Sequence, residues 1–457
     1  MRNNHGFTML AIPLWTLAAL AIFSTTPRAA EPAPQEPQTA AEFVKRGGAS
    51  YRQNDFPAAI RDFTKAIELD PENAGTYRRR ALSHSKRNNL DAALADYNTA
   101  AKLEPNHAQT YYNRGVIQAR RRRTQNAVRD YGRAIELNPW HAASYYNRAN
   151  LLGARLGDND AAIRDYDKVL ELKPDHKNAH VSRGLAYARK GNYDAAIRDY
   201  DRALAMNPQK VSAYNNRGIA HRKKGDFDAA IRDYDTALEI EPGNRLSYYN
   251  RGVLHAQRRD YDAAIRDYDK AIELAGPVFY TMAHSARANA YSSKGDYDAA
   301  LRDFNLALRK SPDNSRLWFR RGWFYAKWND DDAALRDFTK AIEIYPKYGQ
   351  AYNERGLVLT RKGDYDAAIR DFDKAVELYP QFSSAYRNRG IAYRKKGDLD
   401  AAIRDFQKTL EIDPTSAYAP AELDLTLRMK NGEDIVEWDE GKTAGLDFDD
   451  DDDSPLW

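Results

Sequence analysis

One block of sequence recurs along almost the whole chain. Residues 211–242 read VSAYNNRGIAHRKKGDFDAAIRDYDTALEIEP, and nearly everything between residues 40 and 414 is a variant of this block. A single block is too short to bury a hydrophobic core of its own, so neighbouring blocks are expected to stack on one another. A proline closes each copy at intervals of 34 or 35 residues, at Pro71, Pro105, Pro139, Pro174, Pro208, Pro242, Pro277, Pro312, Pro346, Pro380 and Pro414.

Each block predicts a pair of helices. Tyr214, Arg217, Gly218 and His221 recur at spacings of three and four, so they are expected to lie along one side of a first helix. Gly225 ends that helix, and Asp226 is suited to cap the helix that follows. The apolar residues of this second helix again have helical spacing, until the closing proline stops it.

The block resembles the tetratricopeptide repeat in three respects: its period, an aromatic and a small residue on the first helix, and a second helix that ends in proline. The resemblance covers eleven units, residues 40–414, and implies an all-α fold: a right-handed α-solenoid, or superhelix, of stacked helix-turn-helix repeats. The slot of Ala230 is alanine in all eleven units, and the slot of Tyr234 is always Phe or Tyr. We expect a methyl group at the first slot to let two helices approach closely.

An arginine before the glycine departs from the usual pattern of the family, which has an apolar residue there. Every unit has this arginine, as in Arg217 and Arg251, and every unit also has an aspartate just before the second-helix aromatic, as in Asp233 and Asp267. Matching numbers of arginines and aspartates suggest a ladder of partly buried, structural ion pairs. Pairing within a unit and pairing between neighbours both remain open, and solvated surface charges are the alternative.

The amino-terminal residues lie outside the repeats. Residues 1–30 combine Arg2, a long uncharged stretch and small residues at its end, which predicts a signal peptide or, if it is not cleaved, an N-terminal membrane anchor. Residues 31–39 form a proline-rich linker. Both interpretations place the repeats outside the inner membrane of a bacterial cell, in the periplasm. The chain has no cysteine, which excludes disulfides.

The carboxyl-terminal residues are of two kinds. Residues 415–431 predict a capping helix that covers the last apolar surface of the stack. Residues 432–457 form an acidic, disordered tail with eleven acidic residues and one lysine, although the net charge of the whole chain is +4. The tail is expected either to compete weakly for the binding surface of the basic stack or to act only as a solubilising segment.

Catalytic patterns are missing from the sequence. Except for His5, the histidines fall into slots of the repeat, and this includes His176 and His180, whose spacing would otherwise suit a metal pair. There is no glycine-rich phosphate loop, no Ser-His-Asp pattern and no second domain. We therefore expect no enzyme activity, no cofactor and no metal.

The first helices offer candidate binding residues, because in proteins similar to this one they line a concave groove that takes peptides. Amides there can pair with a peptide backbone, aromatic rings add apolar area, and cations favour acidic partners. Alternatively, the amides only solvate an exposed helix face, and the cations only interact with the negative end of the helix dipole. The candidates are Asn113, Asn147, Asn216, Asn250, Asn388, Tyr112, Tyr146, Tyr249, Phe319, Lys223, Arg361 and Lys395.

Three functions fit these patterns. The first is a non-enzymatic scaffold or adaptor that binds proteins or peptides, including acidic ones, in the groove. The second is a carbohydrate-binding component of cell-wall or polysaccharide export machinery, in which tyrosines stack on sugars and asparagines bond to them. The third is nucleic-acid binding, which would use Arg120 to Arg123. The predicted signal peptide or anchor in residues 1–30 argues against this function. Contact with a membrane is expected only through an uncleaved N-terminal segment.

Overall fold

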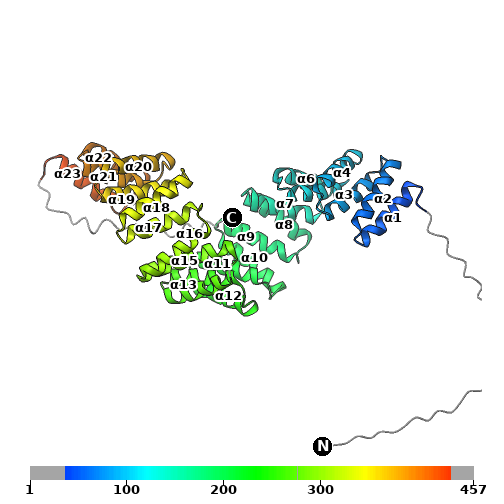
Figure 1. Cartoon of the computed structure of the whole chain (residues 1–457), viewed down its shortest axis with the longest axis horizontal. Helices are drawn as coiled ribbons and strands as arrows, with labels where there is room; N and C mark the ends of the chain where they lie inside the picture. Colours follow the sequence, from blue (N-terminus) through cyan, green and yellow to red (C-terminus); the bar gives the residue numbers. More distant parts are fainter. Residues whose placement is uncertain (1–35, 275, 434–457) are drawn as a thin grey trace, which may run out of the picture. The chain divides into compact units, whose positions relative to one another are not determined.

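A computed structural model describes residues 36–274 and 276–433. These residues form paired helices (Figure 1). The described residues form 23 helices and no strand, so the prediction of an all-α solenoid is confirmed. The predicted signal peptide or anchor (residues 1–30), part of the proline-rich linker and nearly all of the acidic tail lie outside the described residues. Within them, no helix has the length and apolar character needed to cross a bilayer.

The chain divides into two compact units, residues 1–151 and residues 152–457. Odd-numbered helices are the first helices of the repeats, and even-numbered helices are the second. The first helices are α1 (Ala40–Arg52), α3 (Ala74–Lys86), α5 (Ala108–Arg120), α7 (Ala142–Arg155), α9 (Lys177–Arg189), α11 (Val211–Lys224), α13 (Arg245–Gln257), α15 (Pro277–Lys294), α17 (Ser315–Lys327), α19 (Gly349–Arg361) and α21 (Ser383–Lys396).

The second helices are nearly uniform in length. They are α2 (Phe56–Leu69), α4 (Leu90–Leu103), α6 (Thr124–Leu137), α8 (Asn159–Leu172), α10 (Tyr193–Met206), α12 (Phe227–Ile240), α14 (Tyr261–Glu273), α16 (Tyr297–Lys310), α18 (Asp331–Ile344), α20 (Tyr365–Leu378) and α22 (Leu399–Ile412). A final helix, α23 (Ala419–Lys430), packs against α22.

Local chemistry explains where the helices of a repeat meet. The carboxylate of Asp226 accepts a hydrogen bond of 3.2 Å from the backbone N–H of Ala229 and so caps α12. Gly225, between α11 and α12, has φ +85°, a left-handed conformation that glycine adopts without strain. The same cap is formed by Asp55, Asp158, Asp260, Asp296, Asp330, Asp364 and Asp398 at the start of their helices.

Alanine and an aromatic ring form the contact between the helices of each repeat. Ala230 is fully buried, and so are the alanines at its slot in the other ten repeats. A Cβ atom added to Gly218 would lie 2.6 Å from Cε1 of Tyr234, which is closer than real side chains approach. The two helices are therefore held together tightly enough that only small residues fit between the ring and the facing helix.

Candidate functional site

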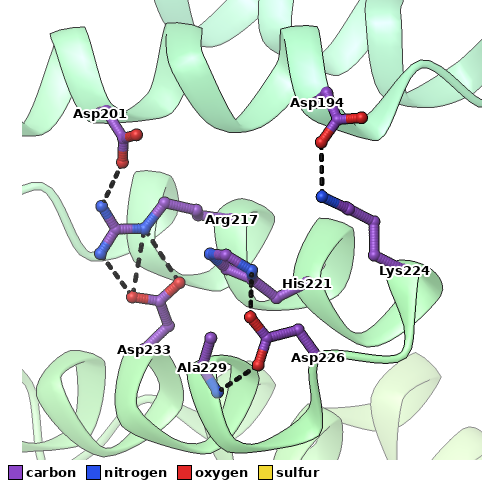
Figure 2. A network of polar contacts seen from close by, with 8 residues as sticks. All are labelled: Asp194, Asp201, Arg217, His221, Lys224, Asp226, Ala229 and Asp233. Carbon is purple, nitrogen blue, oxygen red and sulfur yellow. Dashed lines mark hydrogen bonds and ion pairs between the residues drawn. The ribbon is translucent and has the colours of Figure 1, made fainter.

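In most repeats, the arginine that precedes the glycine slot is bound to the aspartate of its own repeat. The guanidinium of Arg217, on α11, donates from Nη2 to Oδ1 of Asp233 at 2.6 Å and from Nε to Oδ2 at 3.0 Å (Figure 2). Asp233 lies on α12 and is only 4 % exposed. Two parallel donors meeting one carboxylate make this a bidentate pair, which fixes the orientation of both side chains.

The same guanidinium also reaches the preceding repeat. Nη1 of Arg217 donates to Oδ1 of Asp201 on α10 at 2.5 Å (Figure 2). One arginine therefore joins three helices, and the pairing is both within a repeat and between repeats. The same bridge is formed to aspartate by Arg183, Arg251, Arg287 and Arg389, and to an amide or hydroxyl oxygen by Arg80, Arg114, Arg321 and Arg355. We call these contacts the arginine ladder.

Burial and pairing oppose each other in the arginine ladder. Burial lowers the pKa of Arg217, but its hydrogen bonds to Asp233 and Asp201 outweigh this effect, and the pKa lies above its ordinary value. Burial likewise raises the pKa of Asp199, but hydrogen bonds from Arg183 and His180 bring it below its ordinary value. The charged forms of Arg217 and Asp199 are thus maintained by their partners.

A second set of ion pairs runs between neighbouring repeats and was not foreseen. Nζ of Lys224, at the end of α11, lies 2.5 Å from Oδ1 of Asp194, in the first turn of α10 (Figure 2). The sequence signal is a cation at the end of a first helix and an aspartate about 30 residues before it. Equivalent pairs are Arg121–Asp91, Lys190–Asp160, Arg258–Asp228, Lys294–Asp262, Lys362–Asp332, Lys396–Asp366 and Lys430–Asp400.

Within each compact unit, first helices of successive repeats lie side by side. Direct contacts join α1 to α3, α9 to α11, α11 to α13, α13 to α15, α17 to α19, α19 to α21 and α21 to α23. In the first unit, α5 and α7 are joined by a contact between Tyr112 and Asn147. We call the surface of the first helices within each compact unit the first-helix face. Of the predicted binding residues, it includes the half-buried Asn113, Asn147, Asn216, Tyr112, Tyr146, Tyr249 and Lys223, and the exposed Lys395.

The amides and rings of this face contact one another across repeats. Nδ2 of Asn147 lies 3.3 Å from the hydroxyl oxygen of Tyr112, which belongs to the preceding repeat. Nε2 of Gln109 donates to Oδ1 of Asn113 at 2.9 Å, and the ring of Tyr112 lies 4.8 Å from that of His141. Tyr112, Asn113 and Asn147 are therefore positioned by neighbours and still keep part of their surface in solvent.

Three predicted binding residues are buried, and the prediction for them is wrong. Phe319 is only 4 % exposed because its ring packs against Tyr348, with centroids 4.9 Å apart, in the core between two repeats. Asn388 is also buried, and its Nδ2 donates to Oδ1 of Asn353 at 3.0 Å, so its amide is used inside the protein. Asn250 is buried as well. Contacts with neighbouring repeats thus cover Phe319 and Asn388.

The prediction for Arg361 also needs correction. Its guanidinium donates from Nε to Asp331 at 3.1 Å and from Nη2 to the carbonyl oxygen of Ala326, so it belongs to the contacts between repeats. A cation held in this way is not a free site for an acidic partner. The charge pattern of the first helices therefore overstated the positive surface that remains available.

Glu354 is a feature of the first-helix face that the sequence reasoning missed. It occupies the slot of Asn216 in its repeat, and Nδ2 of Asn353 donates to Oε1 at 3.0 Å. Burial raises the pKa of Glu354 to about 7. A carboxyl group in a row of amides was a visible signal, but the burial that changes its protonation depends on the packing around it.

Family models described as tetratricopeptide repeats match most of the chain, at residues 84–121, 108–139, 146–211, 211–244, 246–276, 285–349 and 353–417. The resemblance expected from the period is therefore confirmed. No protein with a curated description matches the chain by sequence.

Solved structures of the same architecture are similar to the chain. Yeast Tom70 is 17 % identical, with a TM-score of 0.50, over 86 % of this chain and 96 % of that one. YrrB, whose structure is described as that of a TPR protein with an unusual peptide-binding site, is 26 % identical over 43 % of this chain and 97 % of its own, with a TM-score of 0.39. MamA from Desulfovibrio magneticus RS-1 is 22 % identical over 37 % of this chain and 96 % of its own, with a TM-score of 0.36.

Proposed function

Because the chain belongs to the tetratricopeptide repeat family, we propose that it is a non-enzymatic scaffold that binds a protein or peptide partner along its first-helix face. The observation that carries this proposal is the cluster of Tyr112, Asn113, Tyr146 and Asn147. These four residues come from two successive first helices, and the Asn147–Tyr112 contact joins the two helices.

The chemistry of this cluster suits an extended peptide. Amide groups both donate and accept, so they can pair with a peptide backbone whatever its side chains are. The tyrosine rings add flat apolar area at little cost in conformational entropy, as in other binding surfaces. The arginine ladder supports this role because it holds successive first helices in a defined register, and a pre-organised surface loses less freedom on binding.

Two predicted cations of the first-helix face are accessible to solvent and favour an acidic partner. Lys395 is exposed and Lys223 is partly exposed on the first-helix face. Electrostatic attraction of this kind is screened by salt, so binding of an acidic peptide should weaken as ionic strength rises. We also propose that the scaffold works outside the inner membrane, on the basis of the predicted signal or anchor in residues 1–30.

Site-specific photo-crosslinking tests the proposal in the native cell. A photoreactive phenylalanine replaces Tyr112 in one variant, Tyr146 in a second and the exposed Glu68 of α2 in a matched control. We expect a discrete protein adduct from the first two variants, with a smaller yield when Asn113 and Asn147 are both changed to Ala. Equal adducts from all three positions would overturn the proposal.

The same experiment separates the carbohydrate alternative. If no protein adduct forms at either tyrosine and the purified chain is retained on a neutral glycan despite high salt, the adaptor proposal fails in favour of sugar binding. A fusion of residues 1–30 to a reporter enzyme that is active only outside the cytoplasm tests the location. An inactive reporter would contradict export.

A further inference from the structure

A pocket of about 600 Å³ opens between α16 and α17, within the second compact unit. Its lining includes Arg302, Asn305, Leu306 and Arg309 from α16, and Trp318 and Arg321 from α17. These two helices pack against each other less closely than the corresponding helices of other repeats do. None of the lining residues belongs to the candidates for the first-helix face, so the pocket is a separate feature.

The pocket coincides with a break in the charge pattern of the repeats. Second helices usually carry a cation and a glutamate three residues apart that pair on the surface. In α16 the two slots hold Leu306 and Arg309, so an ion pair is replaced by an apolar side chain and an added positive charge. The ordinary pairs are Lys65–Glu68, Arg133–Glu136, Lys168–Glu171, Lys270–Glu273, Lys340–Glu343, Lys374–Glu377 and Lys408–Glu411.

The pocket is lined by three guanidinium groups, those of Arg302, Arg309 and Arg321. Arg321 pairs with Asp337, Nε to Oδ2 at 2.6 Å, but on its other side Nη1 donates to the uncharged amide of Asn305. Arg302 and Arg309 are exposed, and among the residues that the structure describes they form no ion pair. Of these three guanidinium groups, only that of Arg321 is paired with a carboxylate, which favours an anionic occupant of the pocket.

Trp318 gives the pocket an apolar wall in a fixed position. Its indole Nε1 donates to the carbonyl oxygen of Pro312 at 2.7 Å. The guanidinium of Arg321 lies 4.9 Å from the ring centroid, so cation and ring are adjacent. Together with Leu306, the ring suits an occupant that combines carboxylates with an apolar or aromatic side chain.

We propose that the acidic segment of this same chain, residues 446–453, docks in this pocket. Its sequence, LDFDDDDD, places Leu446 and Phe448 among six aspartates, so it carries both kinds of group that the lining selects. Docking would place the aromatic ring of Phe448 between Leu306 and Trp318, and the aspartates beside the three arginines. Such pairs are charge-assisted and lose strength as salt is added.

The segment is long enough to reach the pocket. First helices α17, α19, α21 and α23 contact one another in succession, and three helix-to-helix steps of about 10 Å each amount to about 30 Å. From the end of the described chain at Glu433 to Phe448 there are about 15 residues, and an extended stretch of this length spans about 50 Å. Tethering also gives the segment an effective concentration in the millimolar range.

Disulfide trapping in the full-length chain tests this proposal, because the native chain has no cysteine to interfere. One double variant carries Asn305→Cys and Asp450→Cys, which leaves Phe448 and most of the charge in place. The matched control carries Thr339→Cys, at the slot of Asn305 in the next repeat, with the same Asp450→Cys. The rate of intramolecular disulfide formation is followed under mild oxidation, at low and at high salt.

We expect the Asn305 variant to close at least about tenfold faster than the Thr339 variant at low salt, with the difference shrinking at high salt. Adding Leu306→Lys and Arg309→Glu should remove the excess rate. These changes restore the Lys–Glu pair found in the second helices of other repeats, so they are compatible with folding. Equal rates for the two cysteine positions, an excess that persists after this change, or formation of disulfide-linked dimers would each overturn the proposal.

Discussion

Nη1 of Arg217 lies 2.5 Å from Oδ1 of Asp201 in the preceding repeat, while Nη2 and Nε of the same side chain hold Asp233 in its own repeat. A guanidinium has five donors in a rigid plane, so it can satisfy two carboxylates at once. The contact between repeats therefore depends on the same side chain as the contact within the repeat. Register along the stack follows from this sharing.

Arg217→Met should destabilise the stack strongly. Asp233 is 4 % exposed, and removal of its partner leaves a buried charge uncompensated, at a cost of about 3 kcal/mol or more. Urea unfolding followed by circular dichroism measures the change. Adding Asp233→Leu should recover most of the loss, because the uncompensated charge is then removed.

The matched control for this prediction is Lys65→Met. Lys65 pairs with Glu68 on the surface of α2, where both side chains are more than half exposed. Exposed pairs of this kind contribute little, so the unfolding midpoint should stay close to that of the native chain. If Arg217→Met and Lys65→Met had equal effects, the arginine ladder would not be a main source of stability.

Ala230→Leu should destabilise the protein by overpacking. Ala230 is fully buried, and the extra side-chain volume must displace the close contact between α11 and α12, at a cost of about 1–3 kcal/mol. Thermal unfolding compares this variant with Ala205→Leu, which places the same side chain at an exposed position of α10. A melting temperature lowered to the same extent by both variants would contradict the prediction.

Glu354 should make stability fall as pH rises. Its pKa is 4.5 ordinarily and is raised by burial to about 7 in the folded chain. The folded state therefore binds the proton more tightly than the unfolded state. Below pH 4.5 Glu354 does not lower the free energy of unfolding, and above pH 7 its full destabilising effect is present. A shift of this size corresponds to at most about 3 kcal/mol.

Glu354→Gln removes this titration. The variant should be more stable than the native chain at pH 8, and the difference should vanish near pH 4, as measured by urea unfolding at each pH. Glu343→Gln serves as the control because Glu343 is 58 % exposed in its pair with Lys340. A Glu354→Gln advantage that does not change with pH would show that the raised pKa is not its cause.

Glu422→Ala should release the last helix. Oε2 of Glu422, on α23, lies 2.5 Å from Nη1 of Arg394, on α21, and the two side chains are only 11 % and 7 % exposed. Without Glu422 the guanidinium of Arg394 remains buried and unpaired, which disfavours docking of α23. Amide hydrogen exchange should therefore accelerate in Ala419–Lys430 while the helices of the first compact unit keep their protection.

Lys430→Ala is the comparison for this prediction. Lys430 joins the same helix to Asp400, but both side chains are at least half exposed. Exchange in α23 should change little in this variant. Equal acceleration in the two variants would mean that the buried pair has no special part in holding α23.

The eleven helix pairs, their caps and the small contact residues could all be predicted from the sequence. Helical periodicity, the aspartate at Asp226 and the alanine at Ala230 act through the nearest turn or the facing helix, and eleven repetitions of the same slot separate signal from chance. A single block therefore contains nearly all the information that determines the local fold.

The tertiary structure decided what the repeats do to one another. Arg217 and Asp201 lie in different copies of the block, as do Lys224 and Asp194, and which donors meet depends on the angle at which helices cross. The same packing buries Phe319 under the next repeat and raises the pKa of Glu354. Burial is a property of the space between repeats, and a residue's own block does not contain the atoms that fill that space.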